Sequence, residues 1–273
     1  MKELRSEKIF DNTWLIEQKT VYAQTLMYLL CGAERALLID AGMPSRDPLD
    51  ELVGSLTDQP VEVAVTHGHC DHIGNAGLWR RVWLHERDVE TAKAHADKQF
   101  LMGFLADEYP PVLLRILRKT LDRIMDINAP EEYALFGDSH VFDLGGREIE
   151  VVPTPGHTAG SVCFLDRAGG LLFSGDSCCD WGILLHIPHA LGPEVYLASA
   201  GRLLEMQKSG AFSQNYPGHH GYPANGNCPR MYAECAQGIL NGAIKPETKR
   251  GKSYAEVKHE DILITLPKGW RAS

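Results

Sequence analysis

The sequence predicts an α+β protein in which two sheets pack face to face with helices outside. Short apolar runs, bounded by glycine and rich in strand-forming residues, recur in both halves of the 273-residue chain. Segments with helical spacing of apolar residues separate these runs in each half. Because no repeat, low-complexity tract or linker interrupts the pattern, we expect a single domain over residues 1–273.

The first half predicts a strand meander that continues into alternating strands and helices. Five of its segments have the composition of strands: residues 13–17, 25–31, 35–42, 61–66 and 81–85. Residues 45–56 predict a helix because leucines recur on one face and Ser45 is a suitable N-cap. We expect a short helix from about Asn75 and another over residues 86–96.

Residues 97–139 predict a helical insertion of different character. Within it, residues 109–128 form an amphipathic pattern with leucines on one face. The opposite face is basic, with Arg115, Arg118, Lys119 and Arg123. We expect a packed helix with a solvated basic face; a cover over an active site or a contact in a homodimer are the alternatives. Residues 259–270 are a second candidate dimer contact.

The second half resumes the strand pattern. Residues 140–154 predict a hairpin that turns at Gly145-Gly146. The remaining expected elements are strands over residues 161–166 and 170–176, a helix over 194–210, a strand over 212–221 that runs into a turn, and a last strand over 261–267.

Composition narrows the range of functions. The formal net charge of -9 argues against a surface that binds nucleic acid. The N-terminus lacks the apolar core of a signal peptide, and no run of 18 apolar residues predicts a membrane span. Seven cysteines without a CxxC motif are typical of reduced thiols. We therefore expect a cytoplasmic protein without nucleic-acid or membrane partners.

The segment "THGHCDH" crowds four potential metal ligands behind the predicted strand 61–66. Side chains at positions i and i+2 of an extended chain point the same way, so His67 and His69 can reach one point. Asp71 and His72 follow as the chain turns toward a helix, and can reach a second point nearby. Neutral imidazoles with a carboxylate are the ligands of zinc or iron(II).

Three more predicted strands of the second half end in residues of the same kind. His157 lies in "TPGHTAGS", Asp176 in "FSGDS", and His219 and His220 in "PGHHG". Each residue alone is weak evidence, because a histidine in a loop is more often solvated than a ligand. Their recurrence at strand ends favours a shared metal site.

Together these residues resemble the metallo-β-lactamase superfamily. The resemblance spans residues 13–221 and rests on a His-x-His-x-Asp-His element followed by single residues in the expected order: His67, His69, Asp71, His72, His157, Asp176 and His219. Asp40 in "LLIDAG" matches an early aspartate of the same pattern. The resemblance implies a four-layer αββα sandwich with a two-metal site at the edge where the sheets meet.

The resemblance also implies a role for each residue. The first metal would be held by His67, His69 and His157, the second by Asp71, His72 and His219, with Asp176 as the bridge and Asp40 bracing the ligand loops. His219 is preferred to His220 because it occupies the Pro-Gly-His position. Two divalent cations, zinc first with iron or manganese as alternatives, would supply a hydroxide nucleophile, and Asp71 would be the catalytic residue that orients it.

Residues 178–193 follow the expected bridging aspartate and are rich in apolar side chains. This loop predicts a substrate pocket that includes Trp181, His186 and His189, with His220 as a further candidate. Histidines that face water are the competing interpretation. Cys70, Cys178 and Cys179 are expected to be buried thiols without a catalytic role.

The pattern favours a dinuclear zinc hydrolase of a small ester, thioester or lactone. "SCCDWG" departs from the element that follows the bridging aspartate in glyoxalase II and the persulfide dioxygenases, and an intact His69 disfavours a flavo-diiron protein. The missing signal peptide disfavours a secreted β-lactamase. A mononuclear-iron oxidoreductase and a phosphodiesterase or nuclease remain the alternatives, and a non-catalytic binding role is disfavoured because all seven expected ligands are present.

Overall fold

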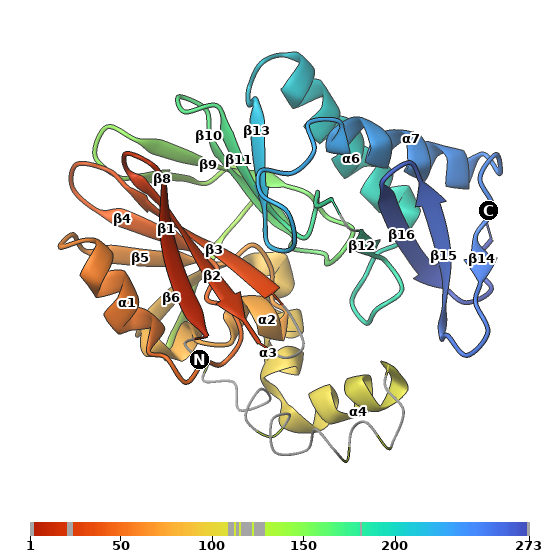
Figure 1. Ribbon diagram of the computed structural model, residues 1–273, viewed down its shortest axis with the longest axis horizontal. Helices are drawn as coiled ribbons and strands as arrows, with labels where there is room; N and C mark the ends of the chain where they lie inside the picture. Colours follow the sequence, from red (N-terminus) through yellow and green to blue (C-terminus); the bar gives the residue numbers. More distant parts are fainter. Residues whose placement is uncertain are drawn as a thin grey trace. The chain divides into compact units, whose positions relative to one another are not determined.

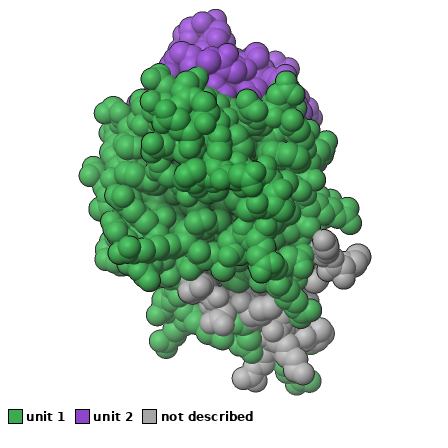
Figure 2. Space-filling model, turned by 90° about the vertical axis from the view of Figure 1, so that its left-hand side faces the viewer, with its two compact units in different colours: residues 1–149 green, residues 150–273 purple. Residues whose placement is uncertain are grey.

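The computed structural model describes residues 3–20, 24–108, 112, 115, 122, 129–180 and 182–271. The chain divides into two compact units, residues 1–149 and 150–273, which Figure 2 shows in separate colours. Each unit has strands, helices and an apolar core of its own, which confirms the predicted α+β class. Within the described ranges, no helix has the length and apolar character needed to cross a membrane.

The first unit contains a seven-stranded sheet whose strands follow chain order (Figure 1). These strands are β1 (Leu4–Phe10), β2 (Thr13–Lys19), β3 (Gln24–Cys31), β4 (Ala36–Ile39), β5 (Val61–Ala64), β6 (Arg81–His85) and β7 (Glu132–Phe136). Neighbours from β1 to β4 are antiparallel, and neighbours from β4 to β7 are parallel. The carboxyl ends of β4 and β5 therefore meet at one edge, the usual location of ligands in parallel sheets.

Among the described residues, six helical segments accompany this sheet: α1 (Leu49–Leu56), α2 (Cys70–Ile73), η1 (Ala76–Leu78), η2 (Glu86–Asp88), α3 (Val89–Ala96) and α4 (Lys98–Glu108). Leu49 and Val53 of α1 belong to the core beside Leu38 and Val63 of the sheet. This contact is what makes a short helix stable in water, because eight residues alone would not hold a helical conformation.

One helix start differs from the prediction, and another agrees with it. Helix α1 begins at Leu49 after Pro48, because the Ser45 hydroxyl accepts the Asp47 N–H in a turn of its own. The short helix expected from about Asn75 is confirmed as η1, whose N-cap is Asn75, and the separate helix α2 precedes it at Cys70–Ile73. The Asn75 side chain donates to the carbonyls of Ala41 and Met43 at 2.7 and 2.6 Å, tying this segment to the loop after β4.

Strands also appear where none was expected. β1 escaped prediction because most of its side chains are exposed at the edge of the sheet, so it lacks an apolar signal. β7 lies inside residues 97–139, the segment that predicted a helical insertion. The amphipathic pattern of residues 109–128 falls outside the described residues, apart from 112, 115 and 122.

The second sheet has the order β13-β11-β10-β9-β8. Its strands are β8 (Val141–Asp143), β9 (Glu148–Pro153), β10 (Val162–Asp166), β11 (Leu171–Gly175) and β13 (Gln214–Pro217). The hairpin predicted at Gly145-Gly146 is confirmed, with φ values of +84° and +78° that favour glycine. β10 is antiparallel to both β9 and β11, and β13 is parallel to β11, so β9, β11 and β13 all end at the same edge.

The rest of the second unit is a four-stranded sheet with two helices. The sheet consists of β12 (Ile183–Leu184), β14 (Glu247–Thr248), β15 (Tyr254–His259) and β16 (Ile262–Pro267) in the order β12-β16-β15-β14. Helices α6 (Pro193–Lys208) and α7 (Cys228–Leu240) pack on each other, and α7 contacts β15 and β16 (Figure 1). Tyr196 and Tyr232 lie at the centre of this core. Of these elements, α6 and β16 were predicted from the sequence.

Candidate metal centre

The first unit gathers four of the predicted ligands after β5, two in the loop that follows this strand and two in α2. His67, His69 and His72 are almost fully buried, with exposures of 1%, 4% and 1%. The Nε2 atom of His67 lies 3.0 Å from Nδ1 of His69, and the Asp71 carboxylate lies 3.9 Å from Nε2 of His72. The Asp71 side chain keeps a quarter of its surface exposed, so it is the member of this group that water can reach.

Asp40, directly after β4, orients His72 through a buried hydrogen bond. Its carboxylate accepts the Nδ1–H of His72 at 2.8 Å and the backbone N–H of Thr66 at 2.7 Å. Asp40 has a φ of +65°, a conformation that aspartate tolerates better than most residues. Because Nδ1 carries the proton in this arrangement, Nε2 is the nitrogen that His72 offers to a ligand.

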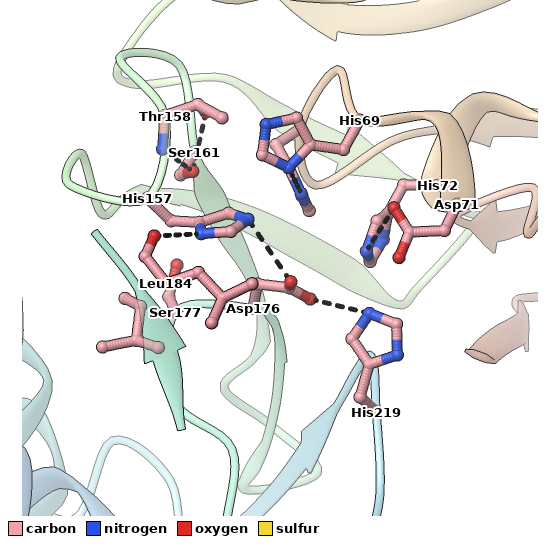
Figure 3. Close-up of polar contacts among 12 residues, drawn as sticks. His69, Asp71, His72, His157, Thr158, Ser161, Asp176, Ser177, Leu184 and His219 are labelled. Atoms are coloured by element: carbon pink, nitrogen blue, oxygen red, sulfur yellow. Dashed lines mark hydrogen bonds and ion pairs between the residues drawn. The ribbon is translucent and has the colours of Figure 1, made fainter. Parts of the chain in front are cut away.

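The second unit gathers the other three predicted ligands at one sheet edge. Asp176 follows β11, and its two carboxylate oxygens contact different histidines (Figure 3). Oδ2 lies 3.3 Å from Nε2 of His157, and Oδ1 lies 3.3 Å from Nε2 of His219. The parallel pairing of β11 with β13 explains this meeting, since it brings two strand ends far apart in sequence to the same edge.

The loop that carries His157 is fastened on both sides. His157 donates from Nδ1 to the Leu184 carbonyl at 2.9 Å, so its Nε2 faces Asp176. Gly156 packs against α6 so closely that a Cβ would lie 2.9 Å from atoms of Tyr196. The Tyr196 hydroxyl in turn donates to the carbonyl of Ser177, the neighbour of Asp176. Tyr196 thus contacts both the loop after β9 and the loop after β11.

The cysteines near the predicted ligands are protonated thiols. Burial and the adjacent Asp71 raise the pKa of the Cys70 thiol far above its ordinary value. A hydrogen bond with Cys228, together with burial, raises the pKa of the Cys178 thiol in the same way. Both thiols are therefore protonated at neutral pH in the metal-free protein, whereas attack on a substrate needs the thiolate.

The predicted substrate-pocket residues have different environments. Trp181 lies outside the described residues. His186 stacks on Tyr254 with ring centroids 4.3 Å apart, and its Nδ1 lies 2.6 Å from the Thr265 hydroxyl, so it packs on β15 and β16. His189 and His220 are exposed. Their roles as substrate contacts stay predictions.

Sequence reasoning missed several polar residues that contact the predicted ligands. The Thr66 hydroxyl lies between the Asp40 carboxylate and Nδ1 of His67, at 3.0 and 3.1 Å. Asp88 and His95 contact the same loop from the segment that begins at η2. Thr66 adjoins the motif and could have been found by its position, whereas Asp88 and His95 carry no local signal because they resemble ordinary helix residues.

The donor set of each unit fits divalent metal ions. It contains imidazole nitrogen and carboxylate oxygen without thiolate, which is typical of zinc, iron or manganese. Two imidazole nitrogens bound to one tetrahedral zinc lie about 3.4 Å apart, close to the spacing between His67 and His69. In His72 and His157, a carboxylate and a carbonyl hold Nδ1, which is the common arrangement around ligating histidines.

Comparison with known proteins agrees with this donor set. The family model described as "Metallo-beta-lactamase superfamily" matches residues 22–210, more than half of the chain. Acyl-coenzyme A thioesterase MBLAC2 of Homo sapiens is 28% identical over 204 residues, which cover 71% of this chain and 72% of the relative. The probable metallo-hydrolase YqgX of Bacillus subtilis is 26% identical over 160 residues, covering 59% of this chain and 69% of the relative.

A solved structure shows the same fold. A metallo-β-lactamase family protein of Thermus thermophilus has a TM-score of 0.62 and 21% sequence identity, with 88% of this chain and 85% of that chain covered. At this identity the likeness concerns the fold alone. The resemblance that the His-x-His-x-Asp-His element carried is thereby confirmed, and the chain belongs to the metallo-β-lactamase superfamily.

Proposed function

We propose that this protein is a dinuclear zinc hydrolase that cleaves acyl thioesters into a carboxylic acid and a thiol. Membership of the superfamily supports a metal-dependent hydrolase. Among the ester, thioester and lactone substrates that the sequence favours, a thioester is supported by relatives named acyl-coenzyme A thioesterase in Homo sapiens and Gallus gallus, at 28% and 29% identity.

The two-sided contact of Asp176 is the observation that carries the dinuclear proposal. A carboxylate that binds a single ion needs only one of its oxygens near the other ligands of that ion. Here each oxygen lies 3.3 Å from a different histidine, and the two histidines come from different loops. This arrangement suits a carboxylate that bridges two cations, with His157 beside one and His219 beside the other.

The proposal assigns the remaining ligands as the superfamily pattern does. His67, His69 and His157 would hold one cation, and Asp71, His72 and His219 the other, with Asp176 shared. Two bound cations would supply a hydroxide at neutral pH and polarise the acyl carbonyl.

The chain's own residues would hold the reacting groups in place. Asp40 keeps the proton of His72 on Nδ1, and the Leu184 carbonyl does the same for His157. Asp71 is the only carboxylate within the motif and keeps part of its surface exposed, so it can accept a hydrogen bond from water and orient it. Its removal should lower turnover even where the protein still binds metal.

Metal content and substrate turnover together test this proposal. We expect close to two zinc ions per chain in protein purified without added metal, and hydrolysis of acyl-coenzyme A esters faster than that of a lactone or bis(p-nitrophenyl) phosphate. Asp176→Ala should lower metal content and abolish hydrolysis together. Asp261→Asn changes an exposed carboxylate of the same unit and is the matched control, which should keep both.

Other outcomes would replace the proposal. Close to one iron per chain, with oxygen uptake on a persulfide and no hydrolysis, would place the protein among mononuclear oxidoreductases. Turnover of the phosphodiester in preference to the thioesters would assign a phosphodiesterase. Full activity of the Asp176→Ala variant would contradict the bridging role.

A further inference from the structure

We propose that Asp88 and His95 are positioning residues that hold the backbone of residues 67–71 and thereby fix the directions of His67 and His69. This inference rests on the proposed metal-dependent function. It adds two residues that lie outside the superfamily motif and well apart from it in sequence. Both belong to the segment that runs from η2 through α3.

Both residues accept hydrogen bonds from the loop that carries the histidines. The Gly68 N–H donates to Oδ2 of Asp88 at 2.6 Å, and the Cys70 N–H donates to Nδ1 of His95 at 3.3 Å. These N–H groups alternate with the side chains of His67, His69 and Asp71 along the chain. Fixing two N–H groups that are two residues apart prevents rotation of the chain about its own axis, so the imidazoles between them keep their directions.

The loop and α3 also touch through their backbones. Gly68 has no side chain, and a Cβ there would lie 2.6 Å from the Ala92 nitrogen and 3.0 Å from the Asp88 carbonyl oxygen. Asp88, Ala92 and His95 recur at intervals of four and three residues, so they lie along one face of the helical segment. The loop packs on that face, where Asp88 and His95 supply the two hydrogen-bond acceptors and the small residue Ala92 lies between them.

Asp88 is buried completely and is itself held in place. The Thr91 hydroxyl donates to its second oxygen, Oδ1, at 3.3 Å. A hydrogen bond from a backbone N–H to a buried carboxylate is short and stronger than one between neutral groups. The hydrogen bond from Gly68 to Asp88 is therefore stronger than the one from Cys70 to His95.

His95 adds contact with the side chain of a proposed ligand. Its ring lies 4.3 Å from the His69 ring, measured between centroids, at an interplanar angle of 37°. The Phe100 ring lies 5.2 Å from His95 and limits its movement. Because Nδ1 of His95 accepts the Cys70 N–H, His95 positions His69 as a hydrogen-bond acceptor and as a packing surface.

Pairs of variants at His95 separate positioning from bulk stability. Asn places its side-chain oxygen near the position of Nδ1 and keeps an acceptor for Cys70, whereas Phe keeps a ring without an acceptor. We expect His95→Phe to lower affinity for zinc about 10- to 100-fold, measured by competition with a chromophoric chelator, and His95→Asn to lower it less. The visible spectrum of the cobalt(II)-loaded protein should change in His95→Phe and remain close to wild type in His95→Asn.

Asp88 gives an independent pair. Asp88→Asn retains an oxygen that can accept the Gly68 N–H, and Asp88→Ala removes it. The Ala variant should lose more zinc affinity than the Asn variant. If His95→Phe fails to fold, His95→Gln replaces it, because the longer side chain places its oxygen near Nε2 and away from the Cys70 N–H.

The measurements distinguish failure of this inference from failure of the proposed function. Suppose that the wild type binds metal and that His95→Phe and Asp88→Ala match its zinc affinity and its cobalt(II) spectrum. The positioning role of Asp88 and His95 is then wrong. Lower melting temperatures of the metal-free variants would in that case show a purely structural role. Wild-type protein that binds metal without cleaving thioesters would refute the substrate alone. Wild-type protein that takes up neither zinc nor cobalt would overturn both.

Discussion

Replacing Asp40 tests how far a single buried carboxylate controls His72, a proposed metal ligand. Asp40 is 2% exposed and accepts the His72 Nδ1–H and the Thr66 N–H. Asp40→Asn is the informative change, because asparagine also tolerates the φ of +65° and leaves the backbone unstrained. Asp40→Ala removes both acceptors and adds the cost of that conformation.

The expected magnitudes follow from the donors that lose a partner. Asn can still accept the Thr66 N–H through its oxygen, but it presents an NH₂ group to His72. One buried donor without a partner should lower the free energy of unfolding by about 1–3 kcal/mol. For Ala, the two N–H donors that lose their acceptor give about 2–6 kcal/mol, whereas the Thr66 hydroxyl can turn to Nδ1 of His67, 3.1 Å away. The left-handed conformation adds about 1–2 kcal/mol.

Metal binding should change together with stability. Next to an amide, His72 can shift its proton to Nε2, which removes the nitrogen that would bind the ion. Loss of such an orienting partner typically lowers metal affinity about 10- to 100-fold. Urea unfolding of the metal-free protein measures the first effect, and zinc competition with a chelator measures the second. Asp58→Asn, an exposed carboxylate of the same unit, is the control and should change stability by less than about 0.5 kcal/mol.

One result would refute this reasoning. An Asp40→Asn variant with wild-type zinc affinity would show that Asp40 does not set the proton position of His72. A loss of stability without any loss of affinity would lead to the same conclusion, since it would leave Asp40 only a structural role.

Three further predictions concern residues of the second unit that adjoin or contact the loops of His157 and Asp176. Gly156→Ala should destabilise the protein by about 1–3 kcal/mol and lower metal content, because its Cβ would lie 2.9 Å from Tyr196; an unchanged melting temperature would contradict the close packing. Tyr196→Phe should cost about 0.5–1.5 kcal/mol in urea unfolding by removing the hydrogen bond to the Ser177 carbonyl, while metal content stays at the wild-type value. Cys178→Ala should keep both metal content and turnover, since the Cys178 thiol lies in the apolar core of the second unit. Loss of one metal ion per chain would show that Cys178 is a ligand.

The motif itself could be located without a structure because its signal is local. His67 and His69 are two residues apart at the end of an apolar strand, and period-two geometry places their side chains together whatever the rest of the chain does. The hairpin at Gly145-Gly146 was predictable for the same reason, since the residues that need a positive φ form the turn themselves. The α+β class followed from the alternation of such local patterns.

The contacts between distant segments needed the tertiary structure. Nothing in "FSGDS" or "PGHHG" says that β11 and β13 pair in parallel, yet that pairing brings Asp176 within 3.3 Å of His219. The sequence likewise does not show that Asp88 and His95 accept hydrogen bonds from the N–H groups of Gly68 and Cys70. The sequence by itself determined which side chains are candidate metal ligands and at which strand ends they lie. Strand order and helix packing decided which of them meet, because non-local contacts depend on the burial of whole faces and leave no periodic trace in either partner.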